Sequence, residues 1–336
     1  MVQTISIPLE KMLSEFKRIL ISRGFSEEEA LECSEIFTNN SIDGVYTHGV
    51  NRFATFVKMV DDGFVKTNKS PSLKSKHAGI EQWDGNQGAG PLNAIHATDT
   101  AIKLSQQYGI GCVALSNTNH WMRGGTYGWH AAKKGFVFIG WTNTIANLPA
   151  WGAIDNRLGN NPLVLAVPYN DEAIVLDMAM SQYSFGSLHQ TKMKDEKLLV
   201  DGGYDTAGKL TKDPSEIISS KRPLPVGYWK GAGLSLLLDI LATILSGGLS
   251  THEISKNKNE TSVSQVFIVI DISKLNNHSS ISAMIENIIN DYHQSSTEEE
   301  TPRIIFPGER VLATRKNNLA NGIPVIKTIW EEIRQL

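Results

Sequence analysis

The middle of this chain alternates short β-rich runs with helical segments, and this pattern constrains the fold most. Helical spacing over residues 93–108 is followed at once by a strand pattern over 111–116, and a further strand pattern covers 263–272. Three more runs bounded by Gly, Pro and Asn have the length and residue types of strands: 136–143, 163–168 and 173–178. We therefore expect an α/β fold, mixed in the α+β sense.

The first sixty residues have a different character and predict helices. Apolar residues recur at helical spacing between residues 9 and 20, and Gly24 follows as a C-terminal cap. Ser26 lies three residues before Glu29, which is the capping-box arrangement that opens a second helix. A third helix is predicted from Val50 onward, so the strands of the fold belong to the later part of the chain.

Charge and hydropathy exclude several classes of partner. The net charge is −3 and the isoelectric point about 6.3, so no general attraction to nucleic acid or anionic lipid is expected. The most apolar segment, Gly233 to Leu245, is shorter than the roughly 20 residues of a membrane span and contains Asp239. We expect it to be a buried core helix. Met1 to Leu9 lacks the pattern of a secretory signal, so a cytoplasmic location with no membrane partner is expected.

Familiar phosphate-binding and metal-binding motifs are missing. Gly109-Ile-Gly111-Cys-Val-Ala114 matches the letters of a dinucleotide-binding glycine motif, but it precedes its strand instead of following it. Phosphates there would meet no helix N-terminus, so a Rossmann fold is not expected. The sequence has no phosphate-binding loop, nucleophile elbow or H-E-x-x-H motif, and its nine histidines lack metal-ligand spacing. No metal site is expected.

The first polar group with catalytic chemistry contains His48 and Arg52. His48 is predicted at a helix start, and in a continuous helix Arg52, four residues later, would share its face. A histidine can donate a proton near neutral pH, and an arginine can hold a carboxylate by two parallel hydrogen bonds. The alternative is a histidine at the helix N-terminus and a solvated arginine.

Two further segments combine chemistry-bearing residues. Residues 117–129 place His120, Arg123, two tryptophans, a tyrosine and several glycines in one loop and helix start. Such a segment either lines a binding site or seals an edge of the core. Asp177 follows four apolar strand residues, and a buried carboxylate there needs a partner such as a histidine. The alternative for Asp177 is a cap of a turn at the strand end.

Seven motifs in order resemble the non-Rossmann lactate/malate dehydrogenase family. They are VYTHGVNRF, NHWMRGGTYGW, WTNTIANLPAWGA, RLGNNPLVLAVP, VLDMAMS, LPVGYWKGAGLSLLLDILATILSGG and PGER. The likeness covers nearly the whole chain from about residue 9, and within the family it is greatest to members that reduce 2,3-diketo-L-gulonate. The resemblance implies the family's own α/β fold with a helical N-terminal region, a homodimer and NAD as NADH, with NADPH as the alternative.

The resemblance also implies roles for individual residues. His48 is expected as the acid–base residue, with Asp177 as a second catalytic residue that orients it. Substrate contacts are expected from Arg52, His120, Trp121, Arg123 and Tyr127. Cofactor contacts are expected from Ile174, Val175, Leu176, Asp177, Met178, Ala179, Met180, Ser181, Trp229, Lys230, Gly308, Glu309 and Arg310. Thr47 stands where many relatives have Ser, and PGER lacks a polar residue that close relatives tend to carry after Gly308.

The expected reaction is hydride transfer to C2 of a small 2-oxo acid. The alternatives are an enzyme of the same fold acting on malate, lactate, ureidoglycolate or a cyclic imino acid, and a binding protein without catalysis. The chain is expected to form one unit over 1–336, with three approximate sub-regions. These are a helical region at 1–65, a central region for cofactor and substrate at 66–250, and a strand with helices at 251–336.

Overall fold

A seven-stranded sheet forms the centre of the computed structural model, which describes residues 3–257, 259–298 and 303–336. Neighbouring strands pair antiparallel except for β3 and β4, which are parallel. From one edge to the other the strands are β2 (Ser72–His77), β3 (Ile80–Asp84), β4 (Ile110–Thr118), β12 (Val263–Asp271), β5 (Phe136–Thr142), β8 (Leu163–Tyr169) and β9 (Glu172–Met178). The expected mixed α/β class is confirmed.

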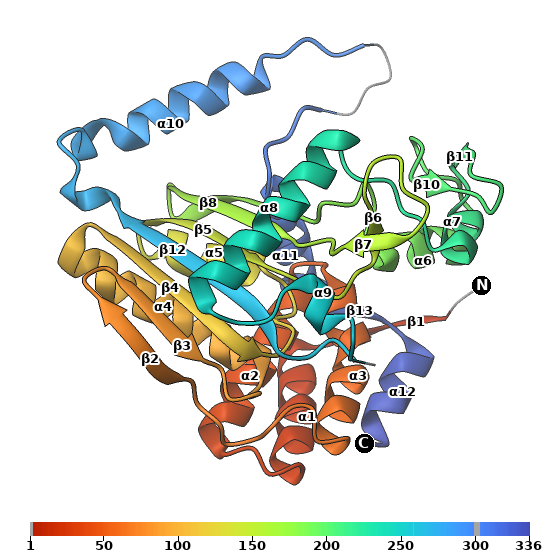
Figure 1. Ribbon diagram of the computed structural model, residues 1–336, viewed down its shortest axis with the longest axis horizontal. Coiled ribbons are helices and arrows are strands. Elements are labelled where there is room, and N and C mark those ends of the chain that lie inside the picture. The colour runs from red at the N-terminus through yellow and green to blue at the C-terminus, as the bar shows by residue number, and fades with distance from the viewer. Residues whose placement is uncertain (1–2, 258, 299–302) are drawn as a thin grey trace.

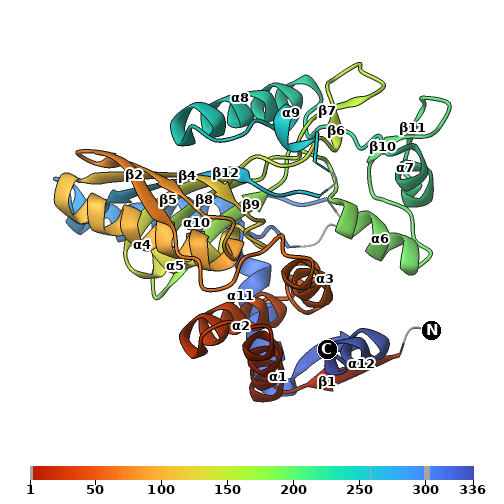
Figure 2. The same ribbon diagram turned by 60° about the horizontal axis from the view of Figure 1, so that its bottom comes forward.

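Helices cover both faces of this sheet (Figure 2). On one face lie α4 (Gly90–Tyr108) and α5 (Gly125–Lys133), which enclose a core with Phe138 and Phe267. On the other face lies α8 (Trp229–Ser246), which packs through Leu238 and Ala242 against Trp141 and its neighbours. The sheet therefore has an apolar layer on each side, as expected for residues that point alternately to the two faces of a strand.

The N-terminal helices form a second apolar cluster with the end of the chain. Helices α1 (Leu9–Ser22), α2 (Glu27–Ile42) and α3 (Val50–Asp61) pack with α12 (Lys327–Arg334). Strand β1 (Thr4–Ile7) pairs with β13 (Ile323–Ile326) along their edge. Ser26 caps α2 through the expected capping box with Glu29. Phe16 and Phe53 stack with centroids 3.9 Å apart, which joins α1 to α3.

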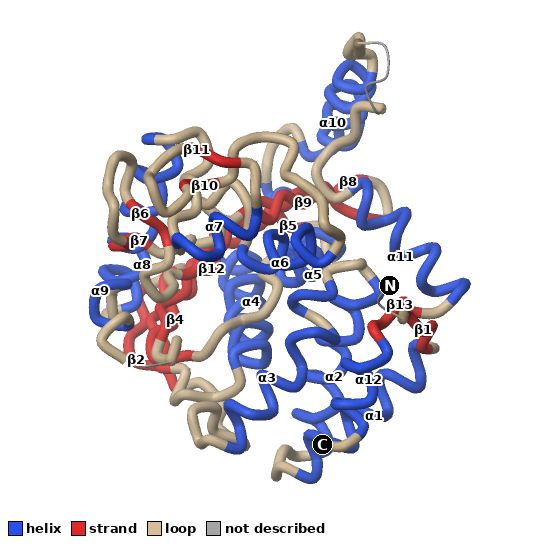
Figure 3. Tube along the Cα trace, turned by 90° about the vertical axis from the view of Figure 1, so that its right-hand side faces the viewer, coloured by secondary structure: helices blue, strands red, loops and turns tan. Residues whose placement is uncertain are grey.

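The expected C-terminal sub-region is divided between these two clusters. Strand β12 lies in the middle of the central sheet, whereas β13 and α12 belong to the N-terminal cluster. Helix α11 (Glu309–Asn321) runs between them, and α10 (His278–His293) projects from the body in Figures 1 and 3. The chain from residue 251 onward therefore contributes both to the central sheet and to the N-terminal cluster.

The remaining elements are short and lie mostly in surface excursions. The polar stretch 191–222 folds into short elements with exposed connections. The short elements are η1 (Tyr46–His48), β6 (Leu148–Pro149), β7 (Asn156–Leu158), α6 (Phe185–Met193), β10 (Gly203–Tyr204), β11 (Leu210–Thr211), α7 (Pro214–Ser220), α9 (Thr251–Ile254) and η2 (Ile272–Lys274).

Gly109 and Gly111, which match the letters of a dinucleotide-binding motif, are needed for the packing of α4 against β4. Gly109 ends α4 with a φ of +85°, a left-handed conformation that glycine adopts without strain. A Cβ on Gly111 would lie 2.1 Å from the carbonyl oxygen of Ala101, so a side chain there would push α4 away from β4. These positions let a helix turn tightly into a strand, in agreement with the expectation that no Rossmann phosphate loop exists here.

The expectation that 233–245 is a buried core helix is wrong. Helix α8 buries one side, but Leu236, Leu237 and Ile244 on the other side are 48%, 55% and 62% exposed. Its length and apolar composition would suffice to cross a membrane, although one such helix is weak evidence because core helices pass the same test. The sequence signal was apolarity all round the helix, which predicts burial. Within the part of the chain that the structure describes, the sheet covers one side of α8 and leaves Leu237 and Ile244 exposed.

Candidate active site

His48 is positioned by a break between two helices. It ends the short helix η1, and α3 begins only at Val50, so His48 and Arg52 do not belong to one continuous helix. The expectation of a shared helix face is therefore wrong. A Cβ on Gly49 would lie 2.3 Å from Ser41 Oγ, so only glycine lets this turn approach α2 so closely. Ser41 Oγ accepts a hydrogen bond from Val50 N at 2.8 Å, which fixes the start of α3.

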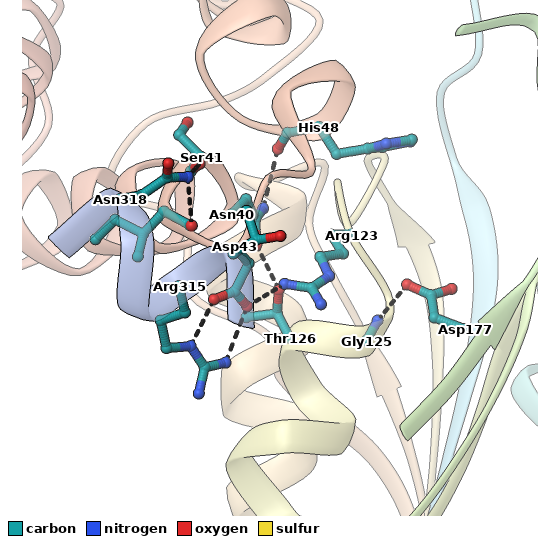
Figure 4. Close-up of polar contacts among 12 residues, drawn as sticks. Asn40, Ser41, Asp43, His48, Arg123, Gly125, Thr126, Asp177, Arg315 and Asn318 are labelled. Carbon is teal, nitrogen blue, oxygen red and sulfur yellow. Dashed lines mark hydrogen bonds and ion pairs between the residues drawn. The ribbon is translucent and has the colours of Figure 1, made fainter. Parts of the chain in front are cut away.

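The ring of His48 faces His120 and is held by its neighbour in sequence. Asn40 Nδ2 donates to the His48 carbonyl oxygen at 2.9 Å (Figure 4), and Thr47 Oγ1 lies 3.1 Å from His48 Nδ1. The rings of His48 and His120 lie nearly parallel, with centroids 5.8 Å apart. A hydrogen bond at Nδ1 leaves Nε2 as the ring atom that can exchange a proton with another molecule.

Opposing influences act on the pKa of His48. Burial lowers this pKa below its ordinary value, because the charged imidazolium loses hydration. The carboxylate of Asp177 opposes that effect, whereas the cations Arg52 and Arg123 reinforce it. Residues from three separate segments therefore act electrostatically on one imidazole.

Asp177 lies at the end of β9 but makes no hydrogen bond to His48. Its Oδ2 accepts from Gly125 N at 2.7 Å, at the N-terminus of α5 (Figure 4). A Cβ on Gly125 would lie 2.9 Å from the same carboxylate oxygen, so glycine is needed for this approach. A helix N-terminus favours a negative charge, which gives the Asp177 carboxylate a stable position. Its influence on the imidazole of His48 is exerted through charge and not through contact.

His120 has a defined ring orientation. Its Nδ1 accepts a hydrogen bond from Met122 N at 3.0 Å, so a neutral ring carries its proton on Nε2. Burial lowers the pKa of His120 well below its ordinary value, with Arg52 and His48 adding to the effect. The ring is therefore neutral near pH 7 and offers one N–H donor. That Nε2 lies 3.9 Å from Glu260 Oε1.

The guanidinium of Arg52 has no partner among the described side chains of this site. It projects from α3 and acts electrostatically on His48, His120 and Glu260, and its guanidinium has no hydrogen bond or ion pair with any residue that the structure describes. A half-buried guanidinium without a carboxylate partner can bind an anion from solution. The sequence-based expectation placed a substrate carboxylate at this residue.

Arg123 has a protein partner instead. It is buried and forms an ion pair with Asp43, which also accepts from Arg315 Nε at 2.6 Å and Nη2 at 3.0 Å (Figure 4). Thr126 Oγ1 donates to Asn40 Oδ1 at 2.6 Å beside this group. The network joins the end of α2 to the start of α5 and to α11. Arg123 thus builds the wall of the site, close enough to influence the pKa of His48.

Trp121 and Tyr127, expected as substrate contacts, belong to the core. Trp121 is 1% exposed and Tyr127 is fully buried; their rings pack beside Phe267. Tyr127 Oη donates to the Trp121 carbonyl oxygen at 2.5 Å, so its polar atom is already satisfied. For these two residues the alternative interpretation, an aromatic segment that seals the core, is the one that the structure supports.

The loops that lead into two of the segments expected to bind a cofactor contact the third segment, 174–181. Val175 N in β9 donates to the Pro307 carbonyl oxygen at 3.1 Å, which brings the loop before α11 against this strand. Farther along, Val226 N donates to the Met180 carbonyl oxygen at 2.8 Å, and this brings the loop before α8 against the residues that follow β9. The loops before α11 and α8 thus contact segment 174–181 at two separate places, Val175 within β9 and Met180 beyond the end of the strand.

These segments offer surfaces that fit a dinucleotide. Trp229 is 66% exposed, and the exposed Lys230 side chain has no ion pair with a described residue. Both stand at the N-terminus of the long helix α8, where the helix dipole favours a phosphate. Gly308 has a φ of +96°, and a Cβ there would lie 3.2 Å from Trp129 and 3.3 Å from Val175 N. Glu309, however, is engaged with Phe306 N at 3.1 Å and His293 Nε2 at 3.0 Å.

Several polar residues at the site were not identified from the sequence. Asn40, Asp43 and Arg315 organise the network behind His48, and Glu260 lies beside His120. Asp43 stands before a glycine, where an acidic residue usually marks a turn, and Glu260 stands in a polar turn before β12. Neither pattern distinguishes a surface residue from one that folds back into a site.

A cavity of about 460 Å³ lies on the other side of the Asp43 network. Helices α2, α4, α5 and α11 line it, with Asn40, Asp43 and Thr126 among its wall residues, whereas His48 and Asp177 are not. In the described ranges, no cluster of three or more His, Cys, Asp or Glu residues could hold a metal ion.

The sequence and structure are similar to those of known oxidoreductases. The family model described as malate/L-lactate dehydrogenase matches residues 7–334. The fold is that of malate/lactate dehydrogenase-type proteins, and this chain lacks a Rossmann glycine motif. The chain belongs to the malate/L-lactate dehydrogenase family, and so to an oxidoreductase family.

Curated relatives match almost the entire chain. The 2,3-diketo-L-gulonate reductase of Pasteurella multocida is 42% identical over 98% of this chain and 99% of its own length. Those of Escherichia coli O6:K15:H31 and Haemophilus influenzae are 42% and 41% identical, with the same shares of each chain covered.

Solved structures match at the level of the fold. Malate dehydrogenase from Pyrococcus horikoshii is 29% identical, with a TM-score of 0.89 over 99% of this chain and 94% of that chain. Malate dehydrogenase from Entamoeba histolytica has a TM-score of 0.93 at 22% identity, over 99% and 97% of the two chains.

Proposed function

We propose that this protein reduces 2,3-diketo-L-gulonate at C2 with a nicotinamide cofactor, giving 3-dehydro-L-gulonate. Full-length relatives at about 42% identity carry the name of this activity, and they support the choice of substrate. The observation that carries the proposal is the grouping of His48, Arg52 and Asp177, which lie on three separate segments, with the charges of Arg52 and Asp177 both acting on the His48 ring. This grouping provides a proton donor and an anion site of the kind that reduction of a 2-oxo acid requires.

His48 donates the proton. As hydride reaches C2, negative charge builds on the carbonyl oxygen, and protonation by His48 Nε2 relieves it. General acid help of this kind contributes roughly 10²–10⁴ in rate. Thr47 Oγ1, 3.1 Å from Nδ1, holds the ring so that Nε2 remains free for this step. Asp177 favours the protonated state of His48 through its negative charge.

Arg52 binds the C1 carboxylate of the substrate. Its guanidinium has no ion pair within the described part of the chain, and it lies near both histidines. Two parallel hydrogen bonds from a planar guanidinium to a carboxylate fix direction as well as position. The neighbouring carbonyl is thereby held in reach of both the proton donor and the hydride, which is the source of the orientation effect in catalysis.

The cofactor is NADH, with NADPH as the alternative. When bound, it supplies the hydride that is transferred to C2. Segments 174–181, 229–230 and 308–310 bind it; Trp229 offers a flat apolar face and Lys230 a charge for a phosphate. Glu309 contributes to the loop through its hydrogen bond with Phe306 N. The backbone N–H groups of such segments can hold phosphate oxygens without a Rossmann motif.

The protein works in the cytoplasm as a homodimer in this proposal. The exposed apolar side of α8 supports the dimer, because an exposed face rich in Leu and Ile usually marks a protein–protein interface.

The alternative function is that of an enzyme of the same family acting on malate, lactate, ureidoglycolate or a cyclic imino acid. One solved neighbour, at 29% identity, is a malate dehydrogenase, which supports malate among these alternatives.

A panel of 2-oxo acids tested with NADH and with NADPH distinguishes these functions. We expect kcat/KM to be highest for 2,3-diketo-L-gulonate. His48→Ala should lower kcat by at least about 10² while NADH binding, followed by fluorescence, stays within twofold of the wild type. Higher kcat/KM on oxaloacetate or pyruvate would support the alternative. Absence of any oxidation of either cofactor across the panel would leave only a binding protein.

A further inference from the structure

We propose that Glu260 and His120 form a subsite that binds a hydroxyl group of the substrate chain beyond the reacting carbonyl. This inference rests on the proposed function for the identity of the substrate, and it assigns to the same site the feature that selects a polyhydroxy acid. The two residues come from segments 140 positions apart, and the charge of Arg52 acts on both side chains. They are therefore near the residue that binds the substrate carboxylate in the proposed function.

The distance between the two side chains suits a bridging hydroxyl. His120 Nε2 and Glu260 Oε1 are 3.9 Å apart, which is too long for a direct hydrogen bond. A hydroxyl oxygen about 2.9 Å from Nε2 and about 2.7 Å from Oε1 fits between these two atoms. It would accept from the imidazole and donate to the carboxylate.

The roles of donor and acceptor follow from contacts on the protein side. His120 Nδ1 already accepts from Met122 N, so Nε2 carries the proton of the neutral ring. Glu260 Oε2 already accepts from Ile145 N at 3.1 Å, which anchors the carboxylate and turns Oε1 toward His120. One N–H donor and one carboxylate acceptor thus remain side by side. A hydroxyl can satisfy both, because it donates and accepts at the same time.

The environment of Glu260 also distinguishes it from a surface carboxylate. Its side chain is only 22% exposed, and Oε1 has no hydrogen bond with a described residue. Burial raises the pKa of Glu260, while the Ile145 N–H bond and the nearby Arg52 oppose that rise. A half-buried carboxylate oxygen without a donor is costly unless a ligand or water supplies one. A substrate hydroxyl would fill that role.

The same charge would disfavour a second carboxylate on the substrate. In oxaloacetate the distal carboxylate would approach Glu260 when Arg52 holds the C1 carboxylate, and like charges at close range repel. Pyruvate carries neither a hydroxyl nor a second carboxylate, so Glu260 should affect it little. Activity on 2,3-diketo-L-gulonate therefore measures hydroxyl recognition, activity on oxaloacetate measures charge repulsion, and activity on pyruvate measures catalysis without either effect.

The variant that tests the subsite is Glu260→Gln. Its amide oxygen can still accept from Ile145 N, so the backbone contact is retained while the charged acceptor is lost. Glu196→Gln is the matched control, because Glu196 is exposed and its carboxylate has no hydrogen bond or ion pair with a described residue. A thermal melt of both variants reports whether the fold is unchanged.

We expect Glu260→Gln to lower kcat/KM for 2,3-diketo-L-gulonate about tenfold, since hydrogen bonds to ionised groups are roughly twice as strong as neutral ones. For pyruvate the value should stay within twofold, and for oxaloacetate it should rise. Glu196→Gln should match the wild type on all three acids. An equal fall on all three substrates, or no change on any, would overturn the subsite.

A binding measurement separates this inference from the proposed function. L-Gulonate and hexanoate, titrated by calorimetry in the presence of NADH, share a six-carbon chain with a carboxylate but differ in hydroxyls. Glu260→Gln should weaken binding of L-gulonate about tenfold relative to hexanoate. If the wild type does not reduce 2,3-diketo-L-gulonate but this difference is found, the proposed function fails and the hydroxyl subsite stands. If the wild type does reduce it but the two ligands are affected alike, only the subsite fails.

Discussion

His48 lies between charges of opposite sign, and this balance makes its protonation testable. Its pKa is held below the ordinary value, mainly by burial, with Asp177 acting against the cations. In reduction the protonated ring is the active form, so kcat/KM should be highest below this pKa and fall as pH rises through it. Because that pKa is depressed, the decline should already be under way on the acidic side of neutrality.

Two substitutions should move this decline in opposite directions. Asp177→Asn removes the charge that raises the pKa of His48, so the decline should shift to lower pH. Arg52→Gln removes a charge that lowers the pKa of His48, so the decline should shift to higher pH. NMR titration of the His48 ring in the free protein measures both shifts without relying on turnover. Shifts in the same direction would contradict the electrostatic assignment.

At the residue scale, local motifs were more informative than composition. His48 and Arg52 could be singled out because their residue types suit acid–base and anion chemistry, although the shared helix face predicted from their spacing is wrong; the His48 ring stacks on His120, and the charge of Arg52 acts on His120. Trp121 and Tyr127 could not be assigned, because an aromatic residue in a glycine-rich loop has the same sequence whether it faces a ligand or the core. Glu260 was missed because its partners, His120 and Ile145, are distant in sequence.

At the element scale, the position of His48 depends on how closely η1 approaches α2. A Cβ on Gly49 would also lie 2.9 Å from Ser41 N and 3.0 Å from the Phe37 carbonyl oxygen, which are backbone atoms that cannot rotate away. Gly49→Ala should therefore destabilise the protein by about 1–3 kcal/mol, the usual range for overpacking. Because the turn carries His48, kcat should fall as well. Urea unfolding and steady-state kinetics measure the two effects. An unchanged kcat would mean that the turn does not position His48.

The junction of α8 with the preceding loop should bind a phosphate of the cofactor. Lys230→Ala removes a point charge at the helix N-terminus, so NADH should bind at least several-fold more weakly. Added salt should weaken binding by the wild type more than by the variant, because screening acts on the charge that the variant lacks. Lys11→Ala, on the exposed side of α1, is the control and should leave NADH affinity unchanged. Equal affinities for all three proteins would remove Lys230 from the cofactor site.

Most long elements could be predicted from periodicity and caps, whereas their pairing could not. The capping box at Ser26 and the strand patterns at 136–143, 163–168 and 173–178 correspond to α2, β5, β8 and β9. Strands β1 and β13 are four residues each, and more than 300 positions separate them in the sequence. No local sequence pattern therefore predicts that they pair. Helix α8 was misjudged because apolarity around a helix does not say which surface covers it.

At the scale of the whole molecule, two apolar surfaces lack a partner within the described chain. On α8, Leu237, Leu241 and Ile244 are 55%, 39% and 62% exposed, and their spacing puts them on one face. On the projecting helix α10 (Figure 3), Met284 and Ile288 are 49% and 66% exposed. A second copy of the chain would bury such faces and gain roughly 25 cal/mol for each Å² of apolar area removed from water.

The dimer should therefore depend on the outer face of α8. Sedimentation at micromolar concentration should give about twice the chain mass of 37.0 kDa for the wild type. Leu237→Glu together with Ile244→Lys should shift the protein to the monomer, because two charges would be buried at the interface without designed partners. Leu199→Glu is the control, since Leu199 is 89% exposed in the excursion 191–222 and should leave the mass unchanged. A wild type that sediments as a stable, fully active monomer would contradict the dimer, and the bare face of α8 would then require another partner.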